Sequence, residues 1–133
     1  MNRTASIART ILVVDDDSAL RNTLIEILEE EGYRASSASN GEEALEVLRR
    51  QGPQPSLILL DMMMPVMDGW GFREEQQKDQ TLSGIPVVIF SAQGNVNEMA
   101  ASVSASAYLK KPLLLKELLE VVGRFCGEGA LSA

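Results

Sequence analysis

The chain has 133 residues, enough for one folded domain with a sizeable core and too few for two. Its composition, 45% hydrophobic and 23% charged, is typical of a globular protein, and no apolar run reaches the roughly 18–20 residues that a membrane span requires. A net charge of −7 argues against binding to nucleic acid or to anionic membranes, and the absence of histidine excludes Ser-His-Asp catalysis, Cys-His catalysis and histidine-ligated metal sites.

The ends of the chain and its single cysteine bear on localisation and domain organisation. The first ten residues contain no apolar segment of a secretory signal, so we expect a cytoplasmic protein. Cys126 cannot form an internal disulfide, which agrees with a reducing compartment. We expect flexible tails over 1–8 and 128–133 and one folded domain over 9–127.

Short apolar runs alternate with segments of helical period, which is typical of a parallel sheet covered by helices on both faces. The predicted strands are 10–15, 33–38, 57–61, 86–91 and 107–111. The predicted helices are 18–31, 40–52, 69–78, 97–104 and 114–126. This alternation predicts an α/β, flavodoxin-like, doubly wound five-stranded sheet with strand order 2-1-3-4-5.

Two of the predicted helices differ in the strength of their sequence signals. Asn40 stands three residues before Glu43, which is the spacing of a capping box at a helix start. The helix at 69–78 carries Trp70 and Phe72 but continues as REEQQK, with almost no apolar face. We therefore expect this helix to be short or loosely packed.

Polar side chains follow four of the strands, at the edge where a doubly wound sheet binds its ligands. They are, in chain order, Asp15-Asp16-Asp17, Asp61, Ser91 and Lys110-Lys111. Carboxylates crowded into one crevice repel one another, and a hard cation such as Mg2+ makes the cluster tolerable. A carboxylate beside such an ion can attack phosphorus, while a hydroxyl and a lysine bind the transferred oxygens. Ser91 and Lys111 fit the last two roles.

Four segments carry a resemblance to a known family. ILVVDDDSALR, LILLDMMMPVMDGW, IPVVIFSA and AYLKKP, in this order, resemble the receiver domain of two-component response regulators, in particular the single-domain, chemotaxis-regulator-like members. The likeness covers about residues 9–126. It implies that Asp61 accepts a phosphoryl group, and that Asp15, Asp16, Asp61 and the Met63 carbonyl hold Mg2+.

The resemblance also assigns residues around the phosphoryl group. It implies that the Ser91 hydroxyl and the Lys111 ammonium bind this group, and that the Lys111–Pro112 peptide is cis. Tyr108 matches the switch aromatic, whose ring turns inward when the hydroxyl of Ser91 moves toward the phosphate. Met63 and Gln93 occupy the positions that tune loss of the phosphoryl group. Because a thioether cannot hydrogen-bond an attacking water, we expect slow self-dephosphorylation.

The partners follow from the same resemblance. A histidine kinase or phosphotransfer protein supplies phosphohistidine, and the chain acts as the phosphoacceptor switch of a two-component phosphorelay. It is not an enzyme with a separate substrate, because it catalyses only its own phosphorylation and dephosphorylation. Phosphorylation changes a protein-binding face formed by the helix at 97–104, the strand at 107–111 and the helix at 114–126. A downstream protein binds there, and neither nucleic acid nor a membrane is expected as a partner.

Two alternatives stay open. The chain could be the receiver fragment of a longer hybrid kinase or regulator. LVVDDDS also resembles the first motif of haloacid-dehalogenase-type phosphatases, with Asp15 as nucleophile and Asp17 as general acid. That family needs a further acidic pair at a strand end after the lysine, and here only Glu117, Glu120 and Glu128 follow.

Overall fold

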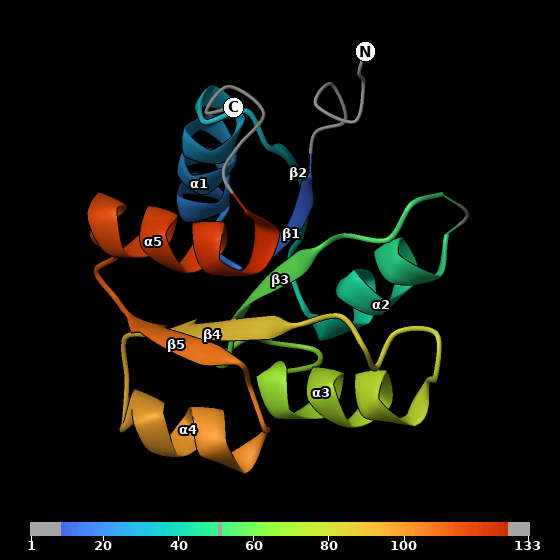
Figure 1. Ribbon diagram of the computed structural model, residues 1–133. Helices are drawn as coiled ribbons and strands as arrows, with labels where there is room; N and C mark the ends of the chain where they lie inside the picture. The colour runs from blue at the N-terminus through green and yellow to red at the C-terminus, as the bar shows by residue number, and fades with distance from the viewer. Residues whose placement is uncertain (1–8, 51, 128–133) are drawn as a thin grey trace.

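A computed structural model describes residues 9–50 and 52–127, and it contains every predicted element with boundaries moved by a few residues at most (Figure 1). The strands are β1 (Thr10–Val14), β2 (Arg34–Ala38), β3 (Leu57–Asp61), β4 (Val87–Ser91) and β5 (Ala107–Lys110). The helices are α1 (Ser18–Glu30), α2 (Gly41–Arg49), α3 (Gly69–Lys78), α4 (Val96–Ser102) and α5 (Leu115–Cys126). The predicted tails, 1–8 and 128–133, lie outside the described residues.

The strands form one parallel sheet in the order β2-β1-β3-β4-β5, which confirms the predicted flavodoxin-like topology. Helices α1 and α5 cover one face, and α2, α3 and α4 cover the other (Figure 1). Every residue of β3 and β4 is buried, as expected for central strands covered on both faces. None of the helices in the described part of the chain has the length and hydropathy needed to cross a membrane.

Two apolar layers hold the helices on the sheet, because successive strand side chains point to opposite faces. In β3, Leu59 packs in the layer beneath α1 and α5, whereas Leu60 packs in the layer beneath α2, α3 and α4. Phe72 of α3 and Leu118 of α5 are buried in these two layers, one on each side of the sheet. Burial of the apolar strand residues fixes the register of each strand against its neighbours. The register in turn fixes where each strand ends along the edge of the sheet.

The starts of α1 and α2 are capped by side chains that the sequence singled out. Asp17 Oδ1 accepts a hydrogen bond of 3.1 Å from the backbone N–H of Leu20, so this carboxylate caps α1. Asn40 Oδ1 accepts one of 2.8 Å from the N–H of Glu43. The returning bond of the capping box goes to Ser39, whose hydroxyl donates to Glu43 Oε1 at 2.9 Å.

The prediction that α3 would be short or loosely packed is wrong. The helix spans ten residues and buries two polar side chains, Arg73 and Gln76, together with Phe72. Both polar side chains are hydrogen-bonded, Arg73 to backbone carbonyls beyond α4 and Gln76 to those of Leu82 and Ile85. Hydrogen bonds thus take the place of an apolar face, a substitution that hydrophobic periodicity does not detect.

Val66, in the loop between β3 and α3, has φ = 69°, a left-handed conformation that is costly for a β-branched residue. Its side chain is 76% exposed, so little packing is lost when it is removed. Val66→Gly should therefore raise the free energy of unfolding by about 1 kcal/mol, measured by urea denaturation. Val66→Ala keeps a Cβ and should give a much smaller gain. Equal effects of the two substitutions would contradict this explanation.

Candidate functional site

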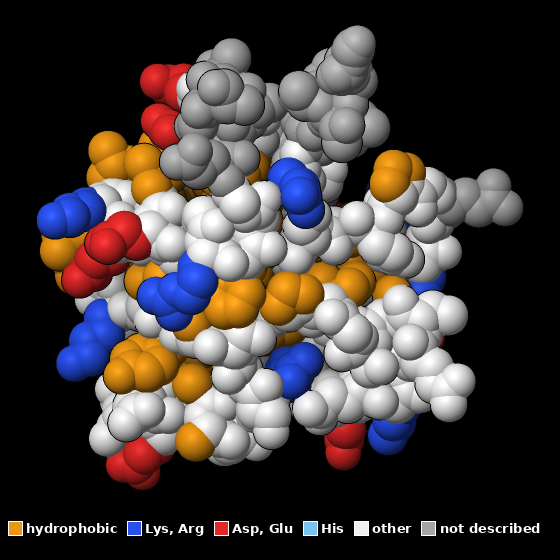
Figure 2. All heavy atoms as spheres, viewed as in Figure 1, with side chains coloured by type: hydrophobic (Ala, Val, Ile, Leu, Met, Phe, Trp, Pro, Cys, Tyr) orange, Lys and Arg blue, Asp and Glu red, His pale blue; other side chains and the backbone are white. Residues whose placement is uncertain are grey.

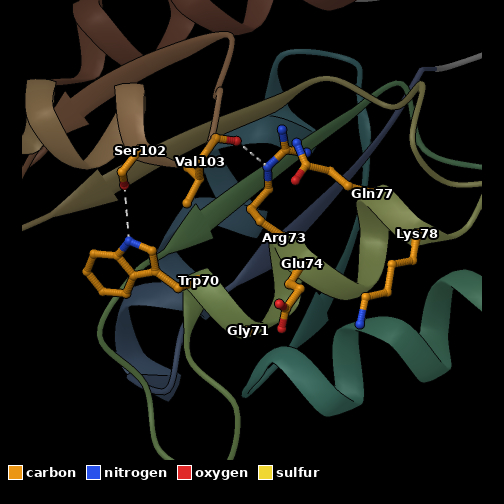
Figure 3. Close-up of a pocket in the computed structure, with 8 residues that line it drawn as sticks. All are labelled: Trp70, Gly71, Arg73, Glu74, Gln77, Lys78, Ser102 and Val103. Atoms are coloured by element: carbon orange, nitrogen blue, oxygen red, sulfur yellow. Dashed lines mark hydrogen bonds between the residues drawn. The ribbon is translucent and has the colours of Figure 1, made fainter.

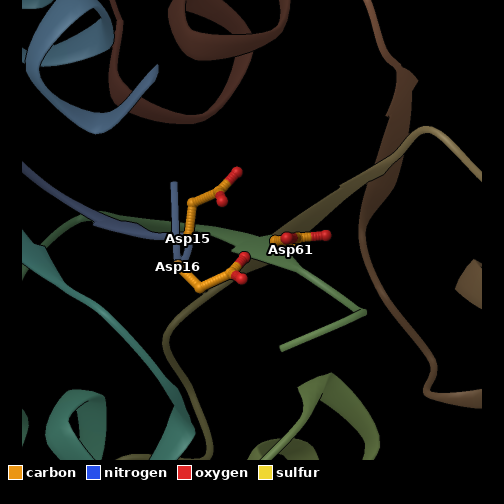
Figure 4. A group of neighbouring side chains, drawn as sticks. All are labelled: Asp15, Asp16 and Asp61. Carbon is orange, nitrogen blue, oxygen red and sulfur yellow. The ribbon is translucent and has the colours of Figure 1, made fainter. Parts of the chain in front are cut away.

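Three carboxylates meet where β1 and β3 end (Figure 4). The two strands are neighbours in register, with Val14 opposite Leu60, so Asp15 and Asp61 follow at the same edge. One carboxylate oxygen from each of Asp15, Asp16 and Asp61 lies within 4.8 Å of the other two. Asp15 and Asp61 are buried and Asp16 is exposed. The structure thus brings together the acids that the sequence placed at these strand ends.

Lys111 reaches this cluster from the end of β5. Its Nζ lies 2.8 Å from Asp15 Oδ2 and 3.5 Å from Asp61 Oδ2. The Lys111–Pro112 peptide is cis, as predicted. Lys110 is exposed, and no ion pair among the described residues includes it. Of the two neighbouring lysines, therefore, Lys111 is the one that contacts the carboxylates.

Ser91 completes the edge from the end of β4 and is 1% exposed. Its hydroxyl contacts the next loop, accepting a bond of 3.3 Å from the N–H of Gln93 and lying 3.2 Å from the carbonyl of the same residue. A hollow of about 280 Å³ joins these groups; its walls include Asp15, Asp16, Asp61, Met63, Ser91 and Lys111. Tyr108 is outside this lining, with a side chain that is 43% exposed.

Burial and like charge shift the acid–base properties of the cluster. Desolvation by burial, reinforced by the charge of Asp15, raises the pKa of Asp61 from 3.8 to about 6. Burial also acts to lower the pKa of Lys111, but its ion pairs with Asp15 and Asp61 outweigh this and the pKa is raised overall. Asp61 is thus a carboxylate whose negative charge is poorly compensated, a state that favours binding of positive charge at this edge.

Two residues that the sequence analysis did not select support the site. Arg21, on α1, donates from Nη1 to the carbonyl oxygen of Asp15 at 2.6 Å. The ring of Phe90 lies under Lys111, with 5.0 Å between Nζ and the ring centroid, within the range of a cation–π contact. Phe90 directly precedes Ser91, but its relation to Lys111 depends on the pairing of β4 with β5 and leaves no local signal in the sequence.

Comparison with known proteins identifies the family. The response regulator receiver domain matches over residues 11–123. A probable transcriptional regulator, ycf27, of Pyropia yezoensis is 42% identical over 110 residues, which are 81% of this chain and 43% of that protein. The response regulator MprA of Mycobacterium leprae is 40% identical over 111 residues, 82% of this chain and 47% of that protein.

A solved structure shows the same fold. The receiver domain of a sensor histidine kinase from Pseudomonas aeruginosa PAO1, solved with a magnesium ion coordinated in its active site cleft, has a TM-score of 0.81 and 25% identity. The similarity covers 92% of this chain and 100% of that one.

The chain therefore belongs to the response regulator receiver domain family, whose members act as signalling switches and not as conventional enzymes. It spans less than half the length of the two curated relatives. Nothing in the structure or the comparisons supports the phosphatase alternative. Glu117 and Glu120 lie on α5 and not at a strand end, and Glu128 falls outside the described residues.

The raised pKa of Asp61 predicts how stability depends on pH. Ionisation of Asp61 destabilises the folded state relative to the unfolded state. This cost is fully present above pH 6, decreases as the pH falls toward 3.8, and disappears below about pH 3, where the carboxyl is protonated in both states. In EDTA at pH 8, Asp61→Asn should raise the free energy of unfolding by about 2–3 kcal/mol. The difference from wild type should shrink to about 0.5 kcal/mol near pH 4 and vanish below about pH 3. Denaturant unfolding across this range provides the measurement, and a gain that does not depend on pH would refute the assignment.

Proposed function

We propose that Asp61 accepts a phosphoryl group from a partner phosphohistidine and that the chain is a phosphoacceptor switch. The observation that carries the proposal is the position of Asp61: a buried carboxylate with the Lys111 ammonium 3.5 Å away, in a hollow that also contains the Ser91 hydroxyl. The membership in the receiver family supports the same assignment. The receiver domain is proposed to extend over residues 9–127.

Asp15, Asp16 and Asp61 also fit a divalent cation, because their oxygens form a compact set of hard ligands. We assign Mg2+ to these three carboxylates and to the carbonyl of Met63. Support comes from the relative of Pseudomonas aeruginosa, which was solved with magnesium in its cleft. When bound, Mg2+ would offset the charge of the carboxylates and of the incoming phosphoryl oxygens.

Asp61 acts as the nucleophile in this proposal. Its carboxylate oxygen forms a bond to phosphorus while the phosphorus–nitrogen bond of the donor breaks, and the histidine ring leaves with the bonding electron pair. Lys111 is held beside Asp61 and Asp15, so its ammonium can bind a transferred oxygen without a large rearrangement. The hydroxyl of Ser91 donates to another of these oxygens, which requires it to leave its contacts with Gln93.

Loss of those contacts links the site to a protein-binding face. Tyr108 is the partner of Ile89 in the β4–β5 pairing and is 43% exposed; it stands two residues before Lys110, which is the partner of Ser91. Movement of Ser91 toward the phosphoryl group would let this ring turn inward and alter the surface of α4, β5 and α5. Figure 2 shows hydrophobic side chains among scattered charged ones on this side of the molecule, a mixed surface that suits a protein target.

The chain covers less than half of each of the two curated relatives, so the way in which the receiver passes on its signal is part of the proposal. The two curated relatives are a transcriptional regulator and a response regulator of more than twice the matched length. In such proteins a further domain can carry the response. For the receiver itself, we propose a histidine kinase or phosphotransfer protein as donor and a downstream protein as target of the α4–β5–α5 face, in a cytoplasmic phosphorelay.

Phosphorylation can be tested directly. With Mg2+ and acetyl phosphate, the wild-type chain should gain about 80 Da in intact mass, the increment of one phosphoryl group. Asp61→Ala should abolish this gain. Asp17→Ala should keep it, because the Asp17 carboxylate caps α1 and is not one of the three that meet, and the bond from Asp17 to Asp15 Oδ1 comes from the backbone N–H, which alanine retains. A phosphoryl group mapped to Asp15, or its persistence in Asp61→Ala, would refute the proposal.

Met63 offers a test of the phosphoryl lifetime. Its side chain is 46% exposed at the wall of the hollow, where a water would approach, and a thioether gives that water no strong hydrogen bond. Met63→Asn should speed hydrolysis roughly tenfold, equivalent to about 1.4 kcal/mol in the barrier. Met63→Leu should leave the half-life unchanged. The decay of the phosphorylated mass after removal of acetyl phosphate measures both, and equal half-lives for Met63→Asn and wild type would sink the idea.

A further inference from the structure

Helix α3 carries a buried cation that none of the ion pairs in the described part of the chain includes. Arg73 is 7% exposed, and its neighbour one turn on, Gln76, is 0% exposed. A buried guanidinium is stable only when its N–H groups are hydrogen-bonded. Nη1 of Arg73 donates to Gln76 Oε1 at 2.6 Å, so the two polar side chains form one unit. The other two hydrogen bonds of the Arg73 guanidinium go to residues outside α3.

Those two bonds go to the C-terminal end of α4. Nε donates to the carbonyl oxygen of Val103 at 2.9 Å and Nη2 to that of Ser104 at 3.1 Å. Val103 directly follows the last residue of α4, and Ser104 turns the chain away with φ = 54°. Helix C-terminal ends carry unpaired carbonyls and the negative end of the helix dipole, so a cation is favoured there. Arg73 thus caps α4 from a different helix.

A second side chain of α3 reaches the same end of α4. Trp70 Nε1 donates to Ser102 Oγ at 3.1 Å, and this hydroxyl in turn donates to the carbonyl of Met99 at 2.7 Å. Between the two helices lies an open hollow of about 570 Å³, whose walls include Trp70, Arg73, Ser102 and Val103 (Figure 3). Long side chains therefore bridge a gap here, and they hold α4 near its last turn.

The opposite end of α4 makes no side-chain hydrogen bond to another element among the described contacts, and its first residue, Val96, is held by apolar packing in the layer beneath α2, α3 and α4. Residues 92–95, which lead from Ser91 to the helix, are exposed. The cap at this end is local, because Asn95 Oδ1 accepts from the N–H of Glu98 and Asn95 Nδ2 donates to Glu98 Oε1. One end of α4 is thus hydrogen-bonded to α3, while the other is held by apolar packing, which is not directional, and is joined to the phosphorylation edge by a short exposed segment.

We infer that Arg73, assisted by Trp70, anchors the C-terminal end of α4, so that α4 responds to phosphorylation by pivoting about this end and moving chiefly at residues 92–98. The trigger rests on the proposed function, whereas the anchor is a property of the unphosphorylated protein. The two can therefore fail separately. Arg73 and Gln76 are positioning residues in this inference and make no contact with Asp61.

The test compares wild type with the double substitution Arg73→Leu, Gln76→Leu. Replacing both side chains by leucine leaves no unmatched polar group on either of them. The four backbone carbonyls that they bonded, two beyond α4 and two after α3, lose these donors, and this sets the loss of stability. Amide hydrogen exchange, followed residue by residue by NMR, reports on the N–H groups of 103–105, which hydrogen-bond back to α4 carbonyls. Without the anchor these amides should exchange at least about tenfold faster, since the helix end opens locally.

The pivot itself is tested with Mg2+ and beryllofluoride, which mimics the phosphoryl group. In wild type, chemical-shift changes along α4 should concentrate at residues 92–98 and be small at 101–105; in the double variant they should extend through 105. Equal changes at both ends in wild type, or unaltered exchange at 103–105 in the double variant, would overturn the inference. Intact-mass detection of the acetyl phosphate adduct in the same proteins tests the proposed function independently.

Two controls separate anchoring from general destabilisation. Val122→Ala creates a cavity on the other face of the sheet, away from α4. It should speed amide hydrogen exchange in the layer beneath α1 and α5 without a selective effect at 103–105. Arg73→Lys keeps the charge with fewer donors and should give exchange rates between those of wild type and the double variant. If the double variant fails to fold, Arg73→Lys alone decides: wild-type rates at 103–105 would refute the anchor.

Discussion

Negative charge crowded at one edge of the sheet is the constraint on which the rest of the structure depends. Asp15 and Asp61 are buried side by side, and the ammonium of Lys111 offsets only part of their mutual repulsion. That lysine comes from the end of β5, with β4 lying between it and β3. The site therefore exists only when four parallel strands are assembled in the correct order. Fold and site are formed by the same packing.

The strand ends could be predicted from the sequence because the signals involved are local. Solid apolar runs mark central strands of a covered parallel sheet, and the residue that follows such a run must lie at the sheet edge. Asp61 after LILL and Ser91 after VVIF are examples. Of the two lysines after the last strand, Lys111 is the one that directly precedes a proline, as in the family pattern, and its ion pair with Asp15 agrees with its assignment to the site. The functional roles of these residues remain predictions.

Other features could not be predicted, because they depend on hydrogen bonds that form only when the chain is folded and that have no pattern in the sequence. From the sequence, Arg73 and Gln76 resemble a solvated helix face. In the folded chain Arg73 bonds a carbonyl 30 residues on, and Gln76 bonds carbonyls in the segment that follows α3. Arg21 is one of several charged residues near the start of α1, and only the folded chain shows that it holds the carbonyl of Asp15. Hydrophobic patterns record burial of apolar groups and are silent on burial by hydrogen bonding.

The location of Trp70 has a practical consequence. It is the only tryptophan in the chain, is 38% exposed, and follows directly after the Asp68–Gly69 start of α3. Its indole hydrogen-bonds across to α4. Because indole emission responds to solvent and to hydrogen bonding, the protein contains an intrinsic optical probe between the loop after Asp61 and the helix after Ser91. Ligand-induced rearrangement of this region is thus open to observation in real time without a chemical label.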